Sequence, residues 1–330
     1  MDSSDRSPAN QRPLPRGRTV IIGLLVLGPV ALGVLIGVGG DWWLLDLISH
    51  FQAYLLVPPF MGLLLALVWR SRRWGLIALA LGILGVAPWL HYWRSSPPAP
   101  PQANDLDLVC FNVNANNPDP DTIASTLLEQ SPDAIALIEV TPRIERALAP
   151  LNAAYPFRYT TARDDYFGMA IWSRLPETTI RETQHGAFQL PSLEVRFLHQ
   201  GQTVRWVVVH PPPPVRLRLF REQSQTLSEL SHQLSGADVL PTLASGDWNL
   251  TPFAGRFRSF ALETQLRDAS IGFGLQPTWR AGSLPFIQLP IDHFLVSRHW
   301  TVVEETVERP LGSDHRLMRL RARLDPEDGG

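Results

Sequence analysis

The sequence predicts two parts with different folds: a helical, membrane-spanning front and a layered α/β domain behind it. Three apolar stretches without charged residues lie in the first 93 residues, each about 20 residues long. A proline-rich segment follows, and after it short apolar runs of strand length alternate with helical spacing. The predicted organisation is a tail at residues 1–18, three transmembrane helices at 19–93, a linker at 94–103, an α/β domain at 104–325 and a tail at 326–330.

The two parts also differ in charge. The formal net charge of the 330 residues is -2, and arginine supplies all 29 basic residues. Residues 1–103 hold 8 Arg against 4 Asp, a net of +4, whereas residues 104–330 hold 21 Arg against 27 Asp and Glu, a net of -6. No overall field favours nucleic acid. The only cysteine, Cys110, excludes an internal disulfide and lies in an apolar run, which predicts a buried core residue.

The front third is predicted to cross the membrane at residues 19–39, 51–69 and 74–93. Each stretch has the length that an α-helix needs to cross a hydrocarbon core of about 30 Å. Tryptophans gather at or near the ends of the stretches, as in an interfacial aromatic belt. His50 and His91 lie near the span ends, so we expect them at the interface rather than as metal ligands.

The flanking arginines predict the orientation. Arginines precede the first stretch and fill the turn between the second and third, at Arg12, Arg16, Arg18, Arg70, Arg72 and Arg73. The loop between the first two stretches carries Asp41 and Asp46 but no arginine. Because positive residues stay cytoplasmic, the N-terminus is predicted inside and the α/β domain outside the cytoplasm. A cleaved signal peptide is the alternative for the first stretch, but its apolar run exceeds the ~7–15 residues of a signal core.

The α/β domain is predicted from its apolar runs. Nine runs have the length and composition of strands: residues 106–111, 134–138, 168–173, 193–198, 204–209, 240–244, 291–297, 301–308 and 317–324. Helical spacing occurs at residues 121–130 and 215–234. This mixture predicts a layered α/β domain rather than a barrel or a bundle.

Polar residues recur at the ends of these predicted strands. They are Asn112, Glu139, His210, Asp247, Asn249, Asp292, Asp314 and His315. A single Asp or Asn at a strand end more often caps a turn or a helix than binds a metal. Together, however, they are the groups that a hard divalent cation and an acid/base pair require: oxygen ligands for the metal and histidines for phosphate charge.

Seven motifs follow one another between residues 107 and 316. They are DLVCFNVN (107–114), ALIEVTP (136–142), FGMAIWSR (167–174), VVVHP (207–211), SGDWNLTP (245–252), LPIDHFLVS (289–297) and GSDHR (312–316). In this order they resemble the endonuclease/exonuclease/phosphatase superfamily, the DNase I-like hydrolases, over nearly the whole domain. The multi-span front resembles a bacterial branch of that superfamily, some of whose members are linked to teicoplanin-type resistance. That branch implies the bacterial cytoplasmic membrane as the location.

The resemblance implies a fold and a metal site. The fold is a four-layer α/β sandwich, in which helices flank two facing sheets and the site lies at one rim. Glu139 would bind Mg²⁺ or Mn²⁺, with Asn112 and Asp314 close by in its first or second coordination shell.

The resemblance also implies catalytic roles. Asp247 would orient or deprotonate the attacking water, helped by Asn249. His210 and His315 would bind the phosphoryl oxygens, and Asp292 would hold the ring of His315. A carboxylate behind a histidine fixes its tautomer and stabilises the imidazolium, which suits this arrangement.

Four residues near the motifs have weaker cases. His293 follows Asp292 directly, and strand alternation points it to the opposite face of the sheet. Arg256, Arg258 and Arg280 lie near motif loops, where they could contact substrate anions, although a solvated surface arginine is the commoner role.

The sequence favours an extracytoplasmic metal-dependent phosphoesterase or pyrophosphatase, whose partners are the bilayer and a membrane-linked phosphate such as a polyprenyl carrier. A nuclease is the alternative, and the net charge of -6 in residues 104–330 argues against it because DNA affinity depends on basic residues. Cleavage of phospholipids or sphingolipids stays open. A non-catalytic membrane module on the same fold is disfavoured, because every candidate catalytic group is present. The sequence does not indicate the oligomeric state.

Overall fold

The computed structural model describes residues 14–38, 42–93, 99–235 and 239–326, which form two compact units. The first unit is drawn from Met1–Gly39 and Phe51–Leu90, and the second from Gly40–His50 and His91–Gly330. The expected N-terminal tail, most of it at residues 1–13, part of the linker at 94–98 and the end of the C-terminal tail lie outside the described residues.

The first unit consists of apolar helices. They are α1 (Arg16–Val38), the 3₁₀ turn η1 (Gln52–Leu56), α3 (Val57–Val68), α4 (Arg72–Val86) and the 3₁₀ segment η2 (Ala87–Tyr92), whose last two residues pack with the second unit. Ile22 and Val26 of α1 pack with Ala66 of α3 and Ala78 of α4. Most other side chains of these helices are apolar and exposed, which is unfavourable in water.

The described residues support fewer membrane spans than the three expected. One helix, Arg16–Gly37, is long and apolar enough to cross a membrane, with a mean hydropathy of 2.7, and a signal sequence would meet the same criterion. A second span results only if Trp43–Ser49 and Gln52–Val68, bent by 70°, count as one. The expected second helix starts late because Pro58 and Pro59 are tolerated only in the first turn of an α-helix, which therefore begins at Val57. The expected third helix, α4, has only 15 residues before the chain turns into 3₁₀ geometry.

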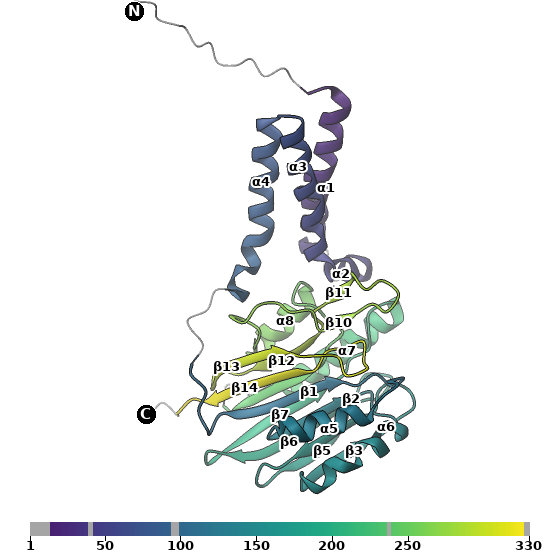
Figure 1. Ribbon diagram of the computed structural model, residues 1–330, viewed down its shortest axis with the longest axis vertical. Coiled ribbons are helices and arrows are strands. Elements are labelled where there is room, and N and C mark those ends of the chain that lie inside the picture. The colour runs from purple at the N-terminus through teal and green to yellow at the C-terminus, as the bar shows by residue number, and fades with distance from the viewer. Residues whose placement is uncertain (1–13, 39–41, 94–98, 236–238, 327–330) are drawn as a thin grey trace, which may run out of the picture. The chain divides into compact units, whose positions relative to one another are not determined.

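The second unit is built on two six-stranded mixed sheets (Figure 1). The first has the order β13 (Trp300–Val307), β14 (Met318–Leu324), β1 (Leu106–Asn112), β2 (Ala134–Ile138), β4 (Met169–Ser173), β3 (Phe157–Thr161). The second has the order β5 (Thr179–His185), β6 (Leu190–His199), β7 (Gln202–Val209), β8 (Thr242–Asp247), β12 (Asp292–Val296), β9 (Arg267–Asp268). Each contains one parallel pair, β1 with β2 and β7 with β8. A separate pair, β10 (Trp279–Arg280) and β11 (Gln288–Leu289), is antiparallel.

The layers follow from how the buried side chains group. One apolar cluster joins the inner faces of both sheets, for example Leu108 of β1 with Trp206 of β7. On the outer face of the first sheet a second cluster includes residues of α5 (Asp121–Gln130) and α6 (Pro142–Ala147). A third cluster covers the outer face of the second sheet with α7 (Leu217–Gln233) and α8 (Gly255–Thr264). Two mixed sheets flanked by helices agree with the DNase I-like sandwich that the resemblance implied.

Candidate active site

The predicted site residues lie at strand ends that meet at one rim of the sandwich. Asn112 and Asp247 end β1 and β8, Glu139 and His210 directly follow β2 and β7, Asp292 begins β12, and Asp314 and His315 precede β14. Because β1 and β2 are parallel, as are β7 and β8, their carboxyl ends share an edge. β12 runs antiparallel to β8 and β14 antiparallel to β1, so their amino ends lie at that same edge.

Asn112 joins the two sheets at this rim. Its side chain is fully buried, and Nδ2 donates to Oε1 of Glu139 and to Oδ2 of Asp247, both at 3.0 Å. Its Oδ1 accepts the backbone N–H of Asn114 at 3.0 Å, which fixes the orientation of the amide. The amide therefore links a residue after β2 in one sheet with the last residue of β8 in the other.

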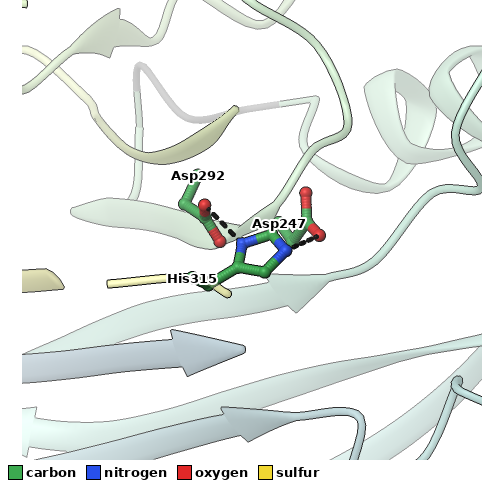
Figure 2. A group of neighbouring side chains, drawn as sticks. All are labelled: Asp247, Asp292 and His315. Atoms are coloured by element: carbon green, nitrogen blue, oxygen red, sulfur yellow. Dashed lines mark hydrogen bonds and ion pairs between the residues drawn. The ribbon is translucent and has the colours of Figure 1, made fainter. Parts of the chain in front are cut away.

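His315 lies between two carboxylates (Figure 2). Its Nδ1 is 2.9 Å from Oδ2 of Asp292, and its Nε2 is 3.6 Å from Oδ2 of Asp247. Burial would lower the pKa of His315, but Asp292, Asp247 and Asp314 outweigh it and raise that pKa to about 10. At neutral pH the ring is therefore an imidazolium held in place by Asp292.

Asp247 is faced by a second histidine. Nε2 of His210 lies 3.5 Å from its Oδ2, and Phe167 packs against the His210 ring with 5.1 Å between centroids. Burial would raise the pKa of Asp247, but His315 and His210 outweigh it and lower that pKa. The carboxylate therefore stays ionised although it is buried. Nδ1 of His210 is buried and has no hydrogen-bond partner among the described residues.

Asn249 belongs to the loop that follows Asp247. Its backbone N–H donates to Oδ1 of Asp247 at 2.9 Å, and its Nδ2 donates to the carbonyl oxygen of Pro211 at 3.0 Å. It therefore ties this loop to the proline run behind His210. Asn249 and Glu139 both have left-handed backbones, with φ of 50° and 64°, a conformation that costs free energy in residues other than glycine and concentrates at functional sites.

Asp314 is held by two residues that the sequence did not single out. Nδ2 of Asn114 donates to its Oδ1 at 2.6 Å, and Nε1 of Trp279 donates to its Oδ2 at 2.9 Å. Asn114 lies in the first motif, two residues after Asn112, so its position could have identified it. Trp279 lies in no motif and comes to the site only through the β10–β11 hairpin.

The rim offers oxygen ligands to a divalent cation at Glu139. This side chain is half-buried, and each oxygen accepts one hydrogen bond, Oε1 from Asn112 and Oε2 from the backbone N–H of Ala115 at 2.9 Å. Among the described residues no basic side chain forms an ion pair with it. A carboxylate has about four lone-pair sites, so Glu139 retains the acceptor capacity that a hard cation needs.

A second group could also hold a metal. Ligand atoms of Asp247, Asp292 and His315 lie within 4.8 Å of one another. A metal at His315 would have to displace the proton that the neighbouring carboxylates hold on its ring. Glu139 fits a cation better, because each of its oxygens accepts a single hydrogen bond and keeps lone pairs for a metal.

Three of the four weaker candidates lie outside this cluster, whereas the backbone N–H of Arg280 donates to the carbonyl oxygen of Asp314 at 3.0 Å. His293 points away, as strand alternation predicted, with Nε2 2.9 Å from the Leu250 carbonyl oxygen and Nδ1 3.6 Å from Asp268. Arg256 is not a free contact for a substrate anion, because it forms an ion pair with buried Asp46. Arg258 donates to the carbonyl oxygens of Pro252 and Phe253, and the Arg280 side chain is exposed.

Two facing sheets that bring these residues to one rim define a DNase I-like phosphoesterase fold. The sequence profile of the Endonuclease/Exonuclease/phosphatase family matches residues 109–315, and the chain belongs to this family. A comparison with curated protein sequences found no significant relative.

Solved structures share the fold. D. rerio TDP2 complexed with a single-strand DNA product is 17% identical, with 66% of this chain and 99% of that chain covered and a TM-score of 0.55. An endonuclease/exonuclease/phosphatase from Beutenbergia cavernae is 20% identical, with 67% and 72% covered and a TM-score of 0.53. The human nocturnin catalytic domain with a bound sulfate anion is 17% identical, with 68% and 96% covered and a TM-score of 0.52.

Proposed function

We propose that this protein is a membrane-anchored phosphoesterase that hydrolyses a phosphoester or pyrophosphate with Mg²⁺ or Mn²⁺. The observation that carries the proposal is the hydrogen-bonded cluster in which Asn112 joins Glu139 to Asp247, while Asp292 and Asp247 flank the ring of His315. It unites a carboxylate able to hold a cation, a carboxylate able to act on water and a cationic ring.

Glu139 would hold the cation, with Asn112 fixing its carboxylate and Asp314 close by. The bound cation supplies neutralisation of the charge that builds on the phosphoryl oxygens during hydrolysis. Asp247 would accept a hydrogen bond from the attacking water and take its proton as the new P–O bond forms. The P–O bond to the leaving group would break in the same displacement, and the leaving oxygen would depart with the electron pair, as a phosphate anion from a pyrophosphate or protonated by solvent from an ester. The backbone N–H of Asn249, bonded to Oδ1 of Asp247, leaves Oδ2 as the oxygen that faces the histidines and the water.

His315 and His210 would donate hydrogen bonds to the phosphoryl oxygens. The imidazolium of His315 suits this role because its charge opposes the charge that develops in the transition state. Asp292 fixes the ring through Nδ1, which leaves Nε2 directed at the rim. Phe167 packs against the His210 ring, whose Nε2 lies 3.5 Å from Oδ2 of Asp247 and would donate its N–H to a phosphoryl oxygen.

The proposed substrate is a phosphate carried by a membrane lipid, such as a polyprenyl pyrophosphate. A span at Arg16–Gly37 with the N-terminus inside would hold the α/β domain outside the cytoplasm. The apolar helix Arg16–Gly37 supports an anchor, and the net charge of -6 in residues 104–330 disfavours a long nucleic-acid track.

The test is phosphate release from polyprenyl pyrophosphate by the purified full chain in detergent with Mg²⁺. Asp247→Ala is expected to lower the rate about 10²- to 10⁴-fold, the range for loss of a general base. Asp164→Ala removes an exposed carboxylate outside the site and serves as the matched control. Release that does not depend on the metal, or that Asp247→Ala retains, would reject the proposal.

A nuclease is the second candidate, favoured by the single-strand DNA product in the D. rerio TDP2 structure of the same fold. Nicking of plasmid DNA by the wild type, with a rate that falls steeply as salt rises, would support it. If Asp247→Ala abolished nicking while the polyprenyl substrate stayed intact, the same site would be acting on nucleic acid.

A further inference from the structure

The segment at residues 42–50 lies between two apolar helices in sequence, yet it folds with the α/β domain. It contains the short helix α2 (Trp43–Ser49) followed by His50, and it belongs to the same compact unit as the two sheets. Asp46, Ser49 and His50 are buried, whereas Trp42 and Leu44 are 74% and 57% exposed. This inverted pattern, with polar side chains inside, indicates that the segment is held by specific polar contacts rather than by apolar packing.

One contact reaches the loop behind His210. Nε1 of Trp43 donates to the carbonyl oxygen of Pro214 at 2.8 Å. Pro214 is the last of the four prolines that follow His210, and proline fixes φ at each of these positions. Trp43 therefore holds the last residue of a stiff proline run, and His210 lies directly before the first residue of that run.

Another contact reaches the loop behind Asp247 and Asn249. The backbone N–H of Thr251 donates to Nδ1 of His50 at 3.2 Å, and the Thr251 hydroxyl lies 3.2 Å from the same nitrogen. Because Nδ1 accepts the backbone N–H, the ring proton is on Nε2, which lies 3.6 Å from Oδ2 of Asp46. That distance is too long for a hydrogen bond and leaves an electrostatic contact.

Asp46 anchors the segment to the start of α8. Its side chain has no exposed surface, and both of its oxygens accept hydrogen bonds from Arg256, one of them from Nε at 3.0 Å. The Arg256 guanidinium also donates to Oγ of Ser224 at 3.2 Å and stacks on Phe220 at 4.2 Å. A two-pronged pair of this kind fixes the geometry of both partners.

We propose that residues 42–50 form a loop clamp that positions His210 and Asn249 for hydrolysis. The inference rests on the proposed function, and it assigns a positioning role to residues outside the 109–315 region that matches the family. Trp43 holds one catalytic loop, His50 holds the other, and Asn249 ties the two loops together through Pro211. The connection between two apolar helices would therefore position two catalytic loops.

The test compares Trp43→Phe, His50→Ala and His50→Asn in the full chain in detergent. Trp43→Phe removes the donated hydrogen bond together with one ring of the indole, and His50→Asn restores an acceptor near the place of Nδ1. We expect Trp43→Phe and His50→Ala to lower kcat about five- to tenfold, because small displacements of catalytic groups act on the chemical step. KM should stay within about twofold, and His50→Asn should regain most of the loss. Leu262→Ala alters a side chain that is 80% exposed and lies outside the clamp, and it should leave kcat unchanged.

Hydrogen–deuterium exchange of residues 248–254 gives a second measurement that needs no turnover. His50→Ala should speed exchange at the Thr251 amide, which loses its acceptor, while exchange in β2 stays the same. Wild-type kinetics in both His50→Ala and Trp43→Phe, or unchanged exchange at residues 248–254 in His50→Ala, would overturn the clamp. If the wild type hydrolyses no phosphoester, the proposed function fails, whereas the exchange measurement still decides whether His50 holds the loop.

Discussion

Single residues place the catalytic groups through backbone positions that other side chains could not occupy. Gly246 precedes Asp247 at the end of β8 and has a φ of 151°. A Cβ at this position would lie 1.9 Å from the carbonyl oxygen of Val209 on the neighbouring strand. Since Val209 precedes His210, this close approach of two strands sets the separation of Asp247 from His210.

Gly246→Ala should therefore lower both stability and activity. The added methyl group meets backbone rather than a flexible side chain, so β7 and β8 must move apart at an expected cost of about 1–3 kcal/mol. Thermal unfolding and kcat check this result. Gly282→Ala, where an added Cβ has no neighbour within 4 Å, is the control. If the two variants have equal melting temperatures, the close approach does not constrain the strands.

The sequence predicted the site residues that lie in motifs at strand ends, and it missed residues that reach the site from elsewhere. The residues predicted from strand ends, such as Asn112 and Asp247, do meet at one rim. Trp279 was not predicted, since it reaches Asp314 through a short hairpin between two-residue strands with no hydrophobic pattern. The role of Asp46 was not predictable either, because its partner Arg256 is 210 positions away.

At the scale of elements, buried segments followed the sequence pattern closely, whereas two edge strands, β5 and β3, were missed. The predicted helix at 121–130 and the predicted strand at 134–138 coincide with α5 and β2. β5 was missed because it is an edge strand with the sequence TIRETQH, whose polar and charged residues hide any continuous apolar run. β3 was missed because, at the edge of the other sheet, no residue in it is fully buried.

The pairing of β12 with β9 contains a buried ion pair that should make stability depend on pH. His293 of β12 lies 3.6 Å from Asp268 of β9, and the Phe257 ring packs against it. Burial would lower the pKa of His293, but Asp268, the Leu250 carbonyl and Asp292 outweigh it and raise that pKa. A raised histidine pKa adds stability that is fully present below the unfolded-state pKa of about 6.5 and is lost as pH rises through the folded-state value.

His293→Gln removes this contribution while keeping a donor for the Leu250 carbonyl. The difference in free energy of unfolding between wild type and variant should be largest at about pH 6 and smaller at about pH 9. Urea unfolding at the two pH values measures it. A difference that stays constant, or that grows as pH rises, would show that the pair does not supply the stability.

At the scale of the whole molecule, the chain joins an apolar helical unit to an acidic α/β unit. The charges of +4 in residues 1–103 and -6 in residues 104–330 divide the chain close to where the two units divide. The division is not complete, since residues 42–50 belong to the α/β unit although they lie between apolar helices in sequence. The charge and apolar patterns predicted two parts of the chain. They did not predict that residues 42–50 fold with the α/β unit, because that depends on ion pairs and hydrogen bonds between residues distant in sequence.

The Mg²⁺ dependence of phosphoester hydrolysis by wild type, Glu139→Gln and Glu145→Gln tests most directly whether a cation bound at Glu139 supports the reaction. Glu145 is an exposed carboxylate on α6, so its variant controls for the loss of one charge. We predict that chelation abolishes wild-type activity, that Mg²⁺ or Mn²⁺ restores it, and that Glu139→Gln needs at least about tenfold more metal for half-maximal rate. Hydrolysis that persists in chelator, or a Glu139→Gln titration that matches Glu145→Gln, would contradict a metal-dependent phosphoesterase with its cation at Glu139.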